Sequence, residues 1–355
     1  MNKEFLNDLL AAYSPSGYET NATDVFGKYV RSFGAKHEFT DKVGNACYSV
    51  GDGDISIMLS GHVDEIALQV QYIDDKGFIH FVRDGGVDPK VLLGSTVKIF
   101  SSITHTAIPG VIGKKPIHVE WHAEDEKDKA TKIKDMKIDI GADTKQEAMA
   151  LVGIGDPIII QDIPMEFMNN RFVGRGLDDK VGVFIVGEVM KEISQLGSRV
   201  PNVRVFGVAC VQEETTASGA VISAAHINPQ YSIDYDVTFA TDDDYVKPEE
   251  WGDIKLGKGG AIAHGVDNNP ELTKLIKDAC NEGNIPYQEF VAPSGGTDTV
   301  HIKQAASDCA TQLLSIPNRN MHTQVEMCDY RDLKSLIDMT VRTIIKINDS
   351  ITKKD

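Results

Sequence analysis

The chain has 355 residues, of which 41% are hydrophobic and 25% are charged, and its formal net charge is -17. This length suits one large domain or two moderate ones, and the apolar content is that of a folded core rather than of a disordered chain. The negative charge argues against nucleic acid or an anionic membrane as a partner, because both attract basic surfaces.

The N-terminal part predicts helices and then strands. Residues 1–33 predict two helices that are broken at Ser14-Pro15-Ser16-Gly17, and Gly34 stops the second one. Residues 43–50 and 55–60 predict two strands joined by the turn Gly51-Asp52-Gly53. The second strand leads into Gly61-His62-Val63-Asp64-Glu65, so a histidine and two acids follow its end.

Residues 68–165 have a different texture, with short apolar runs separated by glycine and aspartate turns. Strands are predicted over 68–73, 78–82, 95–100, 106–112, 137–140 and 156–160, and a short helix over 144–151. This rhythm is typical of a small β-barrel or sandwich. The charged run 124–129 predicts a solvated loop or hairpin tip. We therefore predict an inserted β domain over 68–165, within a larger α/β domain formed by 1–67 and 166–355.

The remainder of the chain alternates strands and helices. Gly174-Arg175-Gly176-Leu177-Asp178-Asp179 leads into a long helix with apolar periodicity. Strands are predicted over 203–211, 237–241 and 310–316, and helices over 217–225, 270–282 and 330–348. A tight glycine-rich loop over 294–298 precedes a further helix. This alternation predicts an α/β fold with a largely parallel sheet.

Acids or histidines follow the predicted strands at every exit. These residues are His62 and Asp64, Glu213 and Glu214, Asp242 and His322, while Asp178 opens a helix. Taken singly, each has an ordinary explanation as a turn acid, a helix N-terminal acid or a surface histidine. Loops at the carboxyl ends of strands converge in open α/β sheets, and ligands bind there. The repetition therefore predicts one shared site.

The residue types at these exits are those of a metal centre. Imidazoles and carboxylates without thiolates suit zinc, cobalt or manganese. Two abutting acids in an apolar setting are costly unless they are paired or bind metal, so we predict that Asp178 bridges two divalent ions. Paired ions activate water and polarise a carbonyl. Of the neighbours Glu213 and Glu214, one would bind metal and the other would act as general base.

The five cysteines and the N-terminus bear on the compartment. The cysteines are scattered and include no C-x-x-C pair, so neither a thiolate zinc site nor a disulfide framework is indicated. A reducing cytoplasm fits them best. The chain opens directly into an amphipathic pattern without a signal-peptide block, and no apolar run is long enough to cross a membrane. We expect a cytoplasmic protein without a membrane partner.

Four segments together resemble a known family. They are Gly61-His62-Val63-Asp64-Glu65-Ile66, Leu177-Asp178-Asp179-Lys180-Val181-Gly182, Gln212-Glu213-Glu214 and Met321-His322-Thr323-Gln324-Val325-Glu326. They closely resemble the signatures of the dinuclear-metal aminopeptidases that assemble as tetrahedral particles. That family has glutamyl, leucyl, lysyl and deblocking members, and some members carry the label endoglucanase. The resemblance covers nearly the whole chain, including Gly85-Gly86-Val87-Asp88-Pro89 and Lys255-Leu256-Gly257-Lys258-Gly259.

The resemblance implies a fold and a role for each site residue. The fold would be a phosphorylase/hydrolase-like three-layer α/β catalytic domain with an inserted small β-barrel that mediates assembly. One ion would be held by His62, Asp178 and Asp242, and the other by Glu214, Asp178 and His322. Glu213 would be the catalytic base, and Asp64 would orient His62. Zinc is expected first, with cobalt or manganese as other ions.

The chain departs from the family pattern in places. The segment before Asp242 looks lengthened, which makes Asp236 a rival for that ligand; we prefer Asp242 because it follows an apolar strand. Thr215 and Thr216 stand where a glycine is usual, and Asn320 and Gln324 replace an aromatic residue and a proline. These departures bear on substrate preference more than on chemistry.

The expected function is metal-dependent hydrolysis of N-terminal residues from peptides, in a dimer-based homo-oligomer of up to twelve chains. One alternative is a metal-dependent deacylase or acyl-peptide hydrolase on the same centre, which an N-acetylated peptide would distinguish from one with a free amine. Another alternative is a glycoside hydrolase, which needs two suitably spaced carboxylates and no metal, so that a chelator would separate the two.

Overall fold

The computed structural model describes residues 1–116, 118, 131–161, 164–292 and 295–352. The chain forms two compact units. The first comprises Met1–Asp64, Pro164–Met321 and Val325–Asp355, and the second comprises Glu65–Ile163 and His322–Gln324. The charged run predicted as a solvated loop, 124–129, lies outside the described residues. No helix in the described ranges combines the length and apolar character that a membrane crossing requires.

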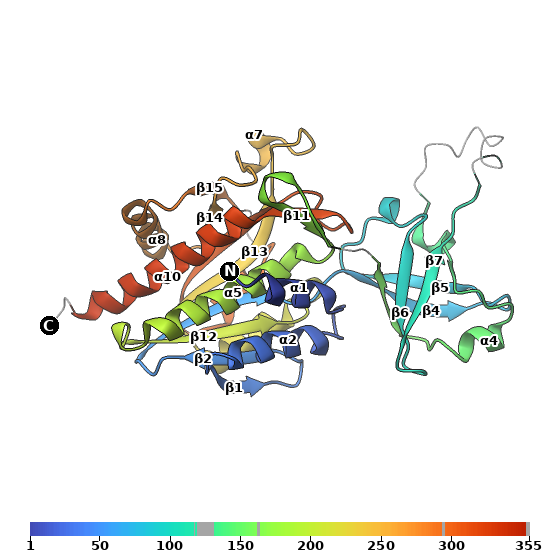
Figure 1. The fold of residues 1–355 in the computed structure, drawn as a ribbon, viewed down its shortest axis with the longest axis horizontal. Coiled ribbons are helices and arrows are strands. Elements are labelled where there is room, and N and C mark those ends of the chain that lie inside the picture. The colour runs from blue at the N-terminus through green and yellow to red at the C-terminus, as the bar shows by residue number, and fades with distance from the viewer. Residues whose placement is uncertain (117, 119–130, 162–163, 293–294, 353–355) are drawn as a thin grey trace. The chain divides into compact units, whose positions relative to one another are not determined.

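An eight-stranded sheet lies at the centre of the first unit, with the order β1-β2-β12-β3-β13-β16-β14-β15 within the described residues (Figure 1). Its strands are β1 (Lys36–Thr40), β2 (Ala46–Val50), β3 (Ile55–His62), β12 (Val203–Cys210), β13 (Tyr231–Phe239), β14 (Gly260–His264), β15 (Tyr287–Val291) and β16 (Ala310–Asn318). The central strands β12, β3, β13 and β16 are parallel. Their carboxyl ends therefore meet at one edge of the sheet, as the sequence predicted.

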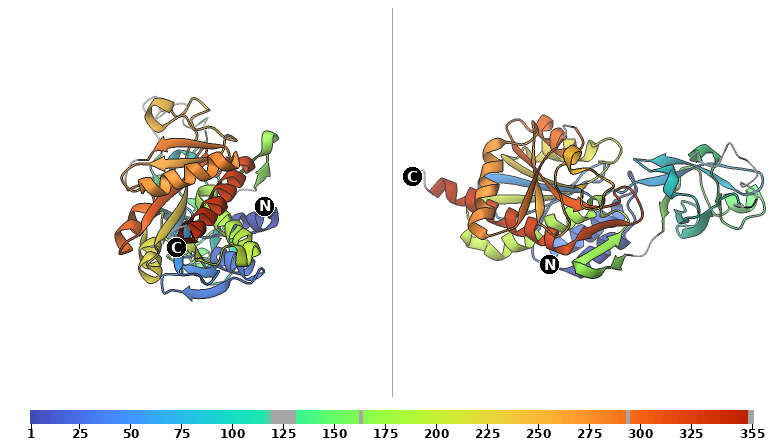
Figure 2. Two further views of the ribbon diagram at one scale, coloured as in Figure 1. Left: turned by 90° about the vertical axis from the view of Figure 1, so that its left-hand side faces the viewer. Right: turned by 90° about the horizontal axis from the view of Figure 1, so that it is seen from above.

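Helices cover both faces of this sheet. On one face lie α1 (Lys3–Ala11), α2 (Thr20–Arg31), α5 (Leu177–Leu196), α8 (Pro270–Gly283) and α10 (Tyr330–Thr352), which share the largest apolar core. The other face packs α6 (Ser218–Ile227) and α9 (Asp298–Ala305) around a smaller core. In Figure 2, α5 and α10 lie side by side. The predicted three-layer α/β fold is confirmed.

Helix α5 is the central helix because it is apolar almost all round. Every residue from Leu177 to Met190 is buried, which is the pattern of a helix enclosed by other elements. Its first turn lies against β3 where that strand carries Gly61. A Cβ at Gly61 would lie 2.8 Å from the backbone nitrogen of Val183 and 2.9 Å from the carbonyl carbon of Gly182. The glycine therefore permits the close approach of helix and strand.

Replacing Gly61 by alanine is expected to destabilise the first unit. The added methyl group meets backbone atoms, which cannot rotate away, and overpacking of this kind costs about 1–3 kcal/mol. The midpoint of urea unfolding should fall accordingly. As a matched control, Gly174→Ala places its methyl group 3.8 Å from the nearest atoms and should change stability far less. Equal midpoints for the two variants would contradict the packing argument.

The first unit also holds a small antiparallel sheet with the order β10-β11-β17. Its strands are β10 (Met165–Glu166), β11 (Arg171–Gly174) and β17 (Glu326–Asp329), and a short α7 (Pro248–Trp251) precedes β14. Strand β11 leads directly into α5, and β17 leads into α10. This sheet therefore lies at the start of two core helices and receives the chain after β16.

The second unit is a closed barrel with the strand order β4-β5-β8-β7-β6-β9 in its described part. The strands are β4 (Ala67–Ile73), β5 (Ile79–Asp84), β6 (Thr96–Phe100), β7 (Ala107–Ile112), β8 (Ile138–Asp139) and β9 (Pro157–Ile160), with α4 (Lys145–Met149) between β8 and β9. Leu68, Val97, Ile99, Ile138 and Ile158 fill its core without exposed surface. The small β-barrel predicted from the turn rhythm is confirmed.

Candidate metal centre

His62 ends β3 and faces carboxylates from two other elements. Its side chain is 2% exposed, and its Nε2 lies 3.0 Å from Oδ1 of Asp178 and 3.9 Å from Oδ1 of Asp236. The three residues offer ligand atoms that all lie within 4.8 Å of one another. One imidazole nitrogen and two carboxylate oxygens at this spacing are donors that suit a divalent cation.

Among the described residues, this group includes Asp236, the rival considered from the sequence, and does not include Asp242, the ligand preferred there. Strand β13 begins at Tyr231 rather than at Val237, so Asp236 lies inside the strand. The parallel register pairs Asp234 with Ser60, and Asp236 extends beyond it as His62 extends beyond Ser60. Asp242 comes after the strand has ended, and its carboxylate accepts a hydrogen bond from Nε of Arg319 at 2.8 Å.

Asp178 and Asp179 lie at the start of α5, where the sequence predicted a bridging acid. The backbone N–H of Asp178 donates to Oε2 of Glu326 at 3.0 Å, which fixes the chain beside the carboxylate. Asp179 has no exposed surface, and its Oδ1 accepts the N–H of Gly182. Its Oδ2 has no hydrogen-bond partner within the part of the chain that the structure describes. The two acids thus differ: Asp179 caps the helix, and Asp178 faces His62.

Glu213 and Glu214 follow β12 after the left-handed residue Gln212, whose φ is 62°. The carboxylate of Glu213 faces His62, and its Oε2 lies 3.9 Å from Nε2 of His62. Burial raises the pKa of Glu213 to about 7; His62 opposes this rise and the charge of Asp178 adds to it. The turn therefore directs one of the two glutamates at the His62 group.

Asp64 contacts both His62 and the turn that carries Glu213 and Glu214. Its side chain is fully buried, and its Oδ1 lies 3.5 Å from Nδ1 of His62. The backbone N–H groups of Glu213 and Glu214 donate to its two carboxylate oxygens at 3.0 and 3.2 Å. The Ser16 hydroxyl donates to the same carboxylate at 2.6 Å. Asp64 thus connects the end of β3 to the turn after β12, a wider role than the orienting of His62 that was expected.

Glu214 follows β12 directly after Glu213, and His322 follows β16. His322 belongs to the three residues 322–324 that the chain contributes to the second unit, flanked by Met321 and Val325 of the first. It adopts a left-handed backbone with φ of 61°, and its Nδ1 lies 3.1 Å from the carbonyl oxygen of Gly86.

Two further buried acids, Asp234 and Asp298, were not predicted. Asp234 is 1% exposed and accepts hydrogen bonds from the hydroxyls of Ser60 at 2.6 Å and Thr299 at 2.9 Å. Asp298, at the start of α9, is 3% exposed, and neither of its carboxylate oxygens has a partner among the described residues. The alternation of polar and apolar residues along β13 is the sequence signal that would have indicated Asp234.

The donor set fits divalent cations. Burial, followed by the charge of Asp178, raises the pKa of Asp236 well above its usual range. Several buried carboxylates thus crowd around one imidazole, and such crowding is costly unless cations offset it. Carboxylate and imidazole donors without a thiolate are those of zinc, cobalt and manganese sites. The residues present are therefore suited to hold the ions that the sequence implied.

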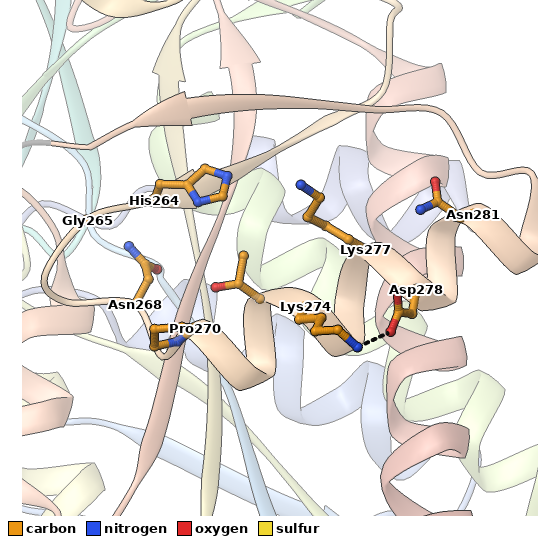
Figure 3. Close-up of a pocket in the computed structure, with 9 residues that line it drawn as sticks. His264, Gly265, Asn268, Pro270, Lys274, Lys277, Asp278 and Asn281 are labelled. Atoms are coloured by element: carbon orange, nitrogen blue, oxygen red, sulfur yellow. Dashed lines mark hydrogen bonds and ion pairs between the residues drawn. The ribbon is translucent and has the colours of Figure 1, made fainter.

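A separate pocket of about 380 Å³ lies along α8 and contains none of the predicted site residues (Figure 3). Its lysines are engaged in ion pairs: Lys274 with Asp278 at 3.1 Å, and Lys277 with Glu289 at 2.9 Å. His264 lies 2.7 Å from the same Glu289. The charged side chains of this pocket are thus paired with one another, and none of them belongs to the His62 group.

Known proteins resemble this chain over most of its length. The family model described as M42 glutamyl aminopeptidase matches residues 44–339. The chain is similar to the lysyl aminopeptidase of Pyrococcus furiosus, with 31% identity over 304 residues that cover 84% of each chain.

Two solved structures extend the likeness to the whole fold. A TET aminopeptidase from a marine-sediment Thaumarchaeota archaeon is 28% identical with a TM-score of 0.90, covering 97% of this chain and 96% of that one. The TET1 peptidase of Pyrococcus horikoshii, described as assembling into a tetrahedron or an octahedral shell, is 28% identical with a TM-score of 0.84. The match covers 96% of this chain and 98% of that one.

Proposed function

Since this chain belongs to the M42 glutamyl aminopeptidase family and is a peptide hydrolase of the aminopeptidase class, we propose how its own residues perform that reaction. The proposal is a site for two divalent ions, the first held by His62, Asp178 and Asp236. The second ion is held by Asp178, Glu214 and His322. The observation that carries the proposal is that His62, Asp178 and Asp236, from three elements of the first unit, offer ligand atoms that all lie within 4.8 Å of one another.

The ions, zinc first and cobalt or manganese as other occupants, supply polarisation of the scissile carbonyl and activation of water. Glu213 is the general base and then the general acid: it takes the proton of the attacking water and returns it to the leaving amine. Its position supports this role, because its carboxylate faces the His62 group without belonging to either donor group. Asp64 keeps Glu213 in place through the backbone N–H.

Removal of the ions is expected to abolish peptidase activity and to leave the fold intact. The protein would be stripped with a chelator and reloaded with zinc, cobalt or manganese, and hydrolysis of a panel of aminoacyl-anilides would be measured. The matched substrate is an N-acetylated aminoacyl-anilide, which an aminopeptidase leaves uncut. Full activity after complete stripping would refute the proposed metal site, and cleavage of the acetylated substrate would point to the deacylase alternative.

The relatives do not favour the deacylase or the glycoside hydrolase that the sequence left open. The relatives described above are named aminopeptidases or peptidases.

The five cysteines are unpaired, and four of them are buried. Free thiols persist in a reducing compartment, which supports the cytoplasm as the proposed location.

We propose that residues 68–165 form an inserted domain through which copies of this chain assemble, with 1–67 and 166–355 as the catalytic domain. Exposed apolar side chains support this: Ile103 is 53% exposed and Ile154 is 64% exposed in the second unit. Their loops lie together, because Ser101 donates to the carbonyl oxygen of Leu151 at 2.6 Å. Clustered exposed apolar residues are typical of protein interfaces. The proposed assembly is dimer-based, with twelve chains in the complete particle.

Replacing Ile154 by aspartate is expected to shift the protein to smaller species, because a charge on an apolar contact must be desolvated for association. Light scattering coupled to gel filtration would measure the mass. The control is Val266→Asp, which changes a residue of similar exposure, 71%, in the first unit. A mass unchanged in Ile154→Asp would exclude this part of the barrel from the interface.

A further inference from the structure

Asp242 lies outside both donor groups, yet its contacts join three separate segments of the first unit. Its Oδ1 accepts from Nε of Arg319 at 2.8 Å, and Nη2 of the same arginine lies 2.8 Å from that oxygen. Its Oδ2 accepts the backbone N–H of Leu256 at 3.3 Å. The segments after β13, before β14 and after β16 therefore meet at one carboxylate.

Arg319 lies at the base of the loop that contains His322. Its backbone N–H donates to the carbonyl oxygen of Met327 at 3.0 Å, and the N–H of Met327 donates back at 3.0 Å. This reciprocal pair closes residues 320–326 into a loop. Asn320 bonds across the loop, with Nδ2 at 3.2 Å from the carbonyl oxygen of Val325. A contact that fixes the position of Arg319 therefore fixes both ends of the loop.

The loop carries groups whose position matters for metal binding. His322 lies in its middle, and Glu326, at its end, accepts the N–H of Asp178. Asn320 and His322 both have left-handed backbones, with φ of 58° and 61°. Such conformations are uncommon for residues other than glycine, although Asn and His adopt them more often than most, and surrounding contacts help to fix them. The contacts of Arg319 with Asp242 and Met327 are of that kind.

From these contacts, and resting on the two-ion site proposed above, we propose that Asp242 and Arg319 are positioning residues that set the affinity for the ion of Asp178, Glu214 and His322. The planar guanidinium fork gives the pair a fixed orientation, which a lysine cannot reproduce. The side chain of Arg319 is only 17% exposed and that of Asp242 only 15%, so the pair is largely shielded from water. Because the two charges cancel, the pair holds the loop without adding a cation beside the metal site.

Zinc titration of the stripped, full-length protein tests this assignment. Ions bound per chain would be counted by elemental analysis at buffered free zinc concentrations. Asp242→Asn and Arg319→Lys should each weaken one ion tenfold or more and leave the other unchanged. The double variant should lose no more than either single variant, since both remove the same clamp. Near-ultraviolet circular dichroism would confirm that each variant keeps its packed fold.

Combinations identify which ion is weakened. Asp242→Asn combined with Asp236→Asn should weaken both ions, whereas its combination with Glu214→Gln should weaken only one. The matched control is Arg204→Lys, which alters another partly buried pair, with Nη2 of Arg204 at 2.6 Å from Oε1 of Glu38. This control should bind both ions with the affinity of the parent.

The outcomes separate this inference from the proposed function. A parent chain that binds fewer than two ions overturns the two-ion site and this inference with it. A parent chain that binds two ions, with Asp242→Asn and Arg319→Lys binding both equally well, overturns only the positioning role. Equal weakening of both ions in these variants also overturns it, because a general loss of structure would then be the cause.

Discussion

Replacing Glu213 by glutamine is expected to lower kcat by about a hundredfold or more and to leave the bound ions in place. A glutamine keeps the size and the hydrogen-bonding reach of the side chain, but it cannot take a proton from water. General bases typically contribute 10²–10⁴-fold to a rate. The backbone contact with Asp64 is unaffected by the change, so the position of the turn should be preserved.

The experiment compares kcat, KM and metal content of Glu213→Gln with those of the parent. Because the residue is not a ligand in either donor group, the ion count should stay the same. Glu250→Gln serves as the control, since Glu250 is an exposed acid of the short helix α7. Peptidase activity close to that of the parent in Glu213→Gln would refute its assignment as the base.

The sequence locates best those positions where a strand ends and a polar residue follows at once. His62 closes β3, and Glu213 follows β12 within a few residues, so local periodicity placed both of them at the carboxyl edge. Parallel pairing then brings these ends together whatever the intervening sequence. Local patterns suffice in such cases because strand ends and turns are encoded locally.

The preference for Asp242 over its rival Asp236 depended on where the strand was predicted to lie. Tyr231, Ile233, Tyr235, Val237 and Phe239 alternate with polar residues, so the strand has one apolar and one polar face. Reading only the continuous apolar run at 237–241 moved the strand end toward Asp242. The alternation was visible in the sequence, and it predicts a ligand within the strand rather than after it.

Other features of the site depend on contacts between distant segments. Ser16 reaches Asp64, and Glu326 reaches the N–H of Asp178, across separations that no local pattern encodes. Strand β14 and the edge strand β15 were missed as well, because both are short and β15 is only partly buried. Three-dimensional packing, rather than residue type, decides these contacts.

Replacing Asp178 by asparagine is expected to weaken both ions together, which is the largest change in metal content that one substitution can cause here. Asp178 is proposed as a ligand of both ions, so each ion loses one of its protein ligands. Asparagine is nearly isosteric, but it is neutral and has one oxygen where the carboxylate has two. The loss of charge also removes attraction for both cations. We expect affinities for both ions to fall about 10–100-fold or more, as is typical when a metal site loses a supporting group.

The adjacent residue provides the decisive control. Asp179 is more deeply buried than Asp178, but its Oδ1 accepts the N–H of Gly182 and it belongs to neither proposed donor group. Asp179→Asn should therefore keep two ions, although the helix start is altered in both variants. Zinc titration with elemental analysis would compare the two proteins directly. Two tightly bound ions in Asp178→Asn would refute the bridge, and loss of only one ion would assign Asp178 to a single metal position.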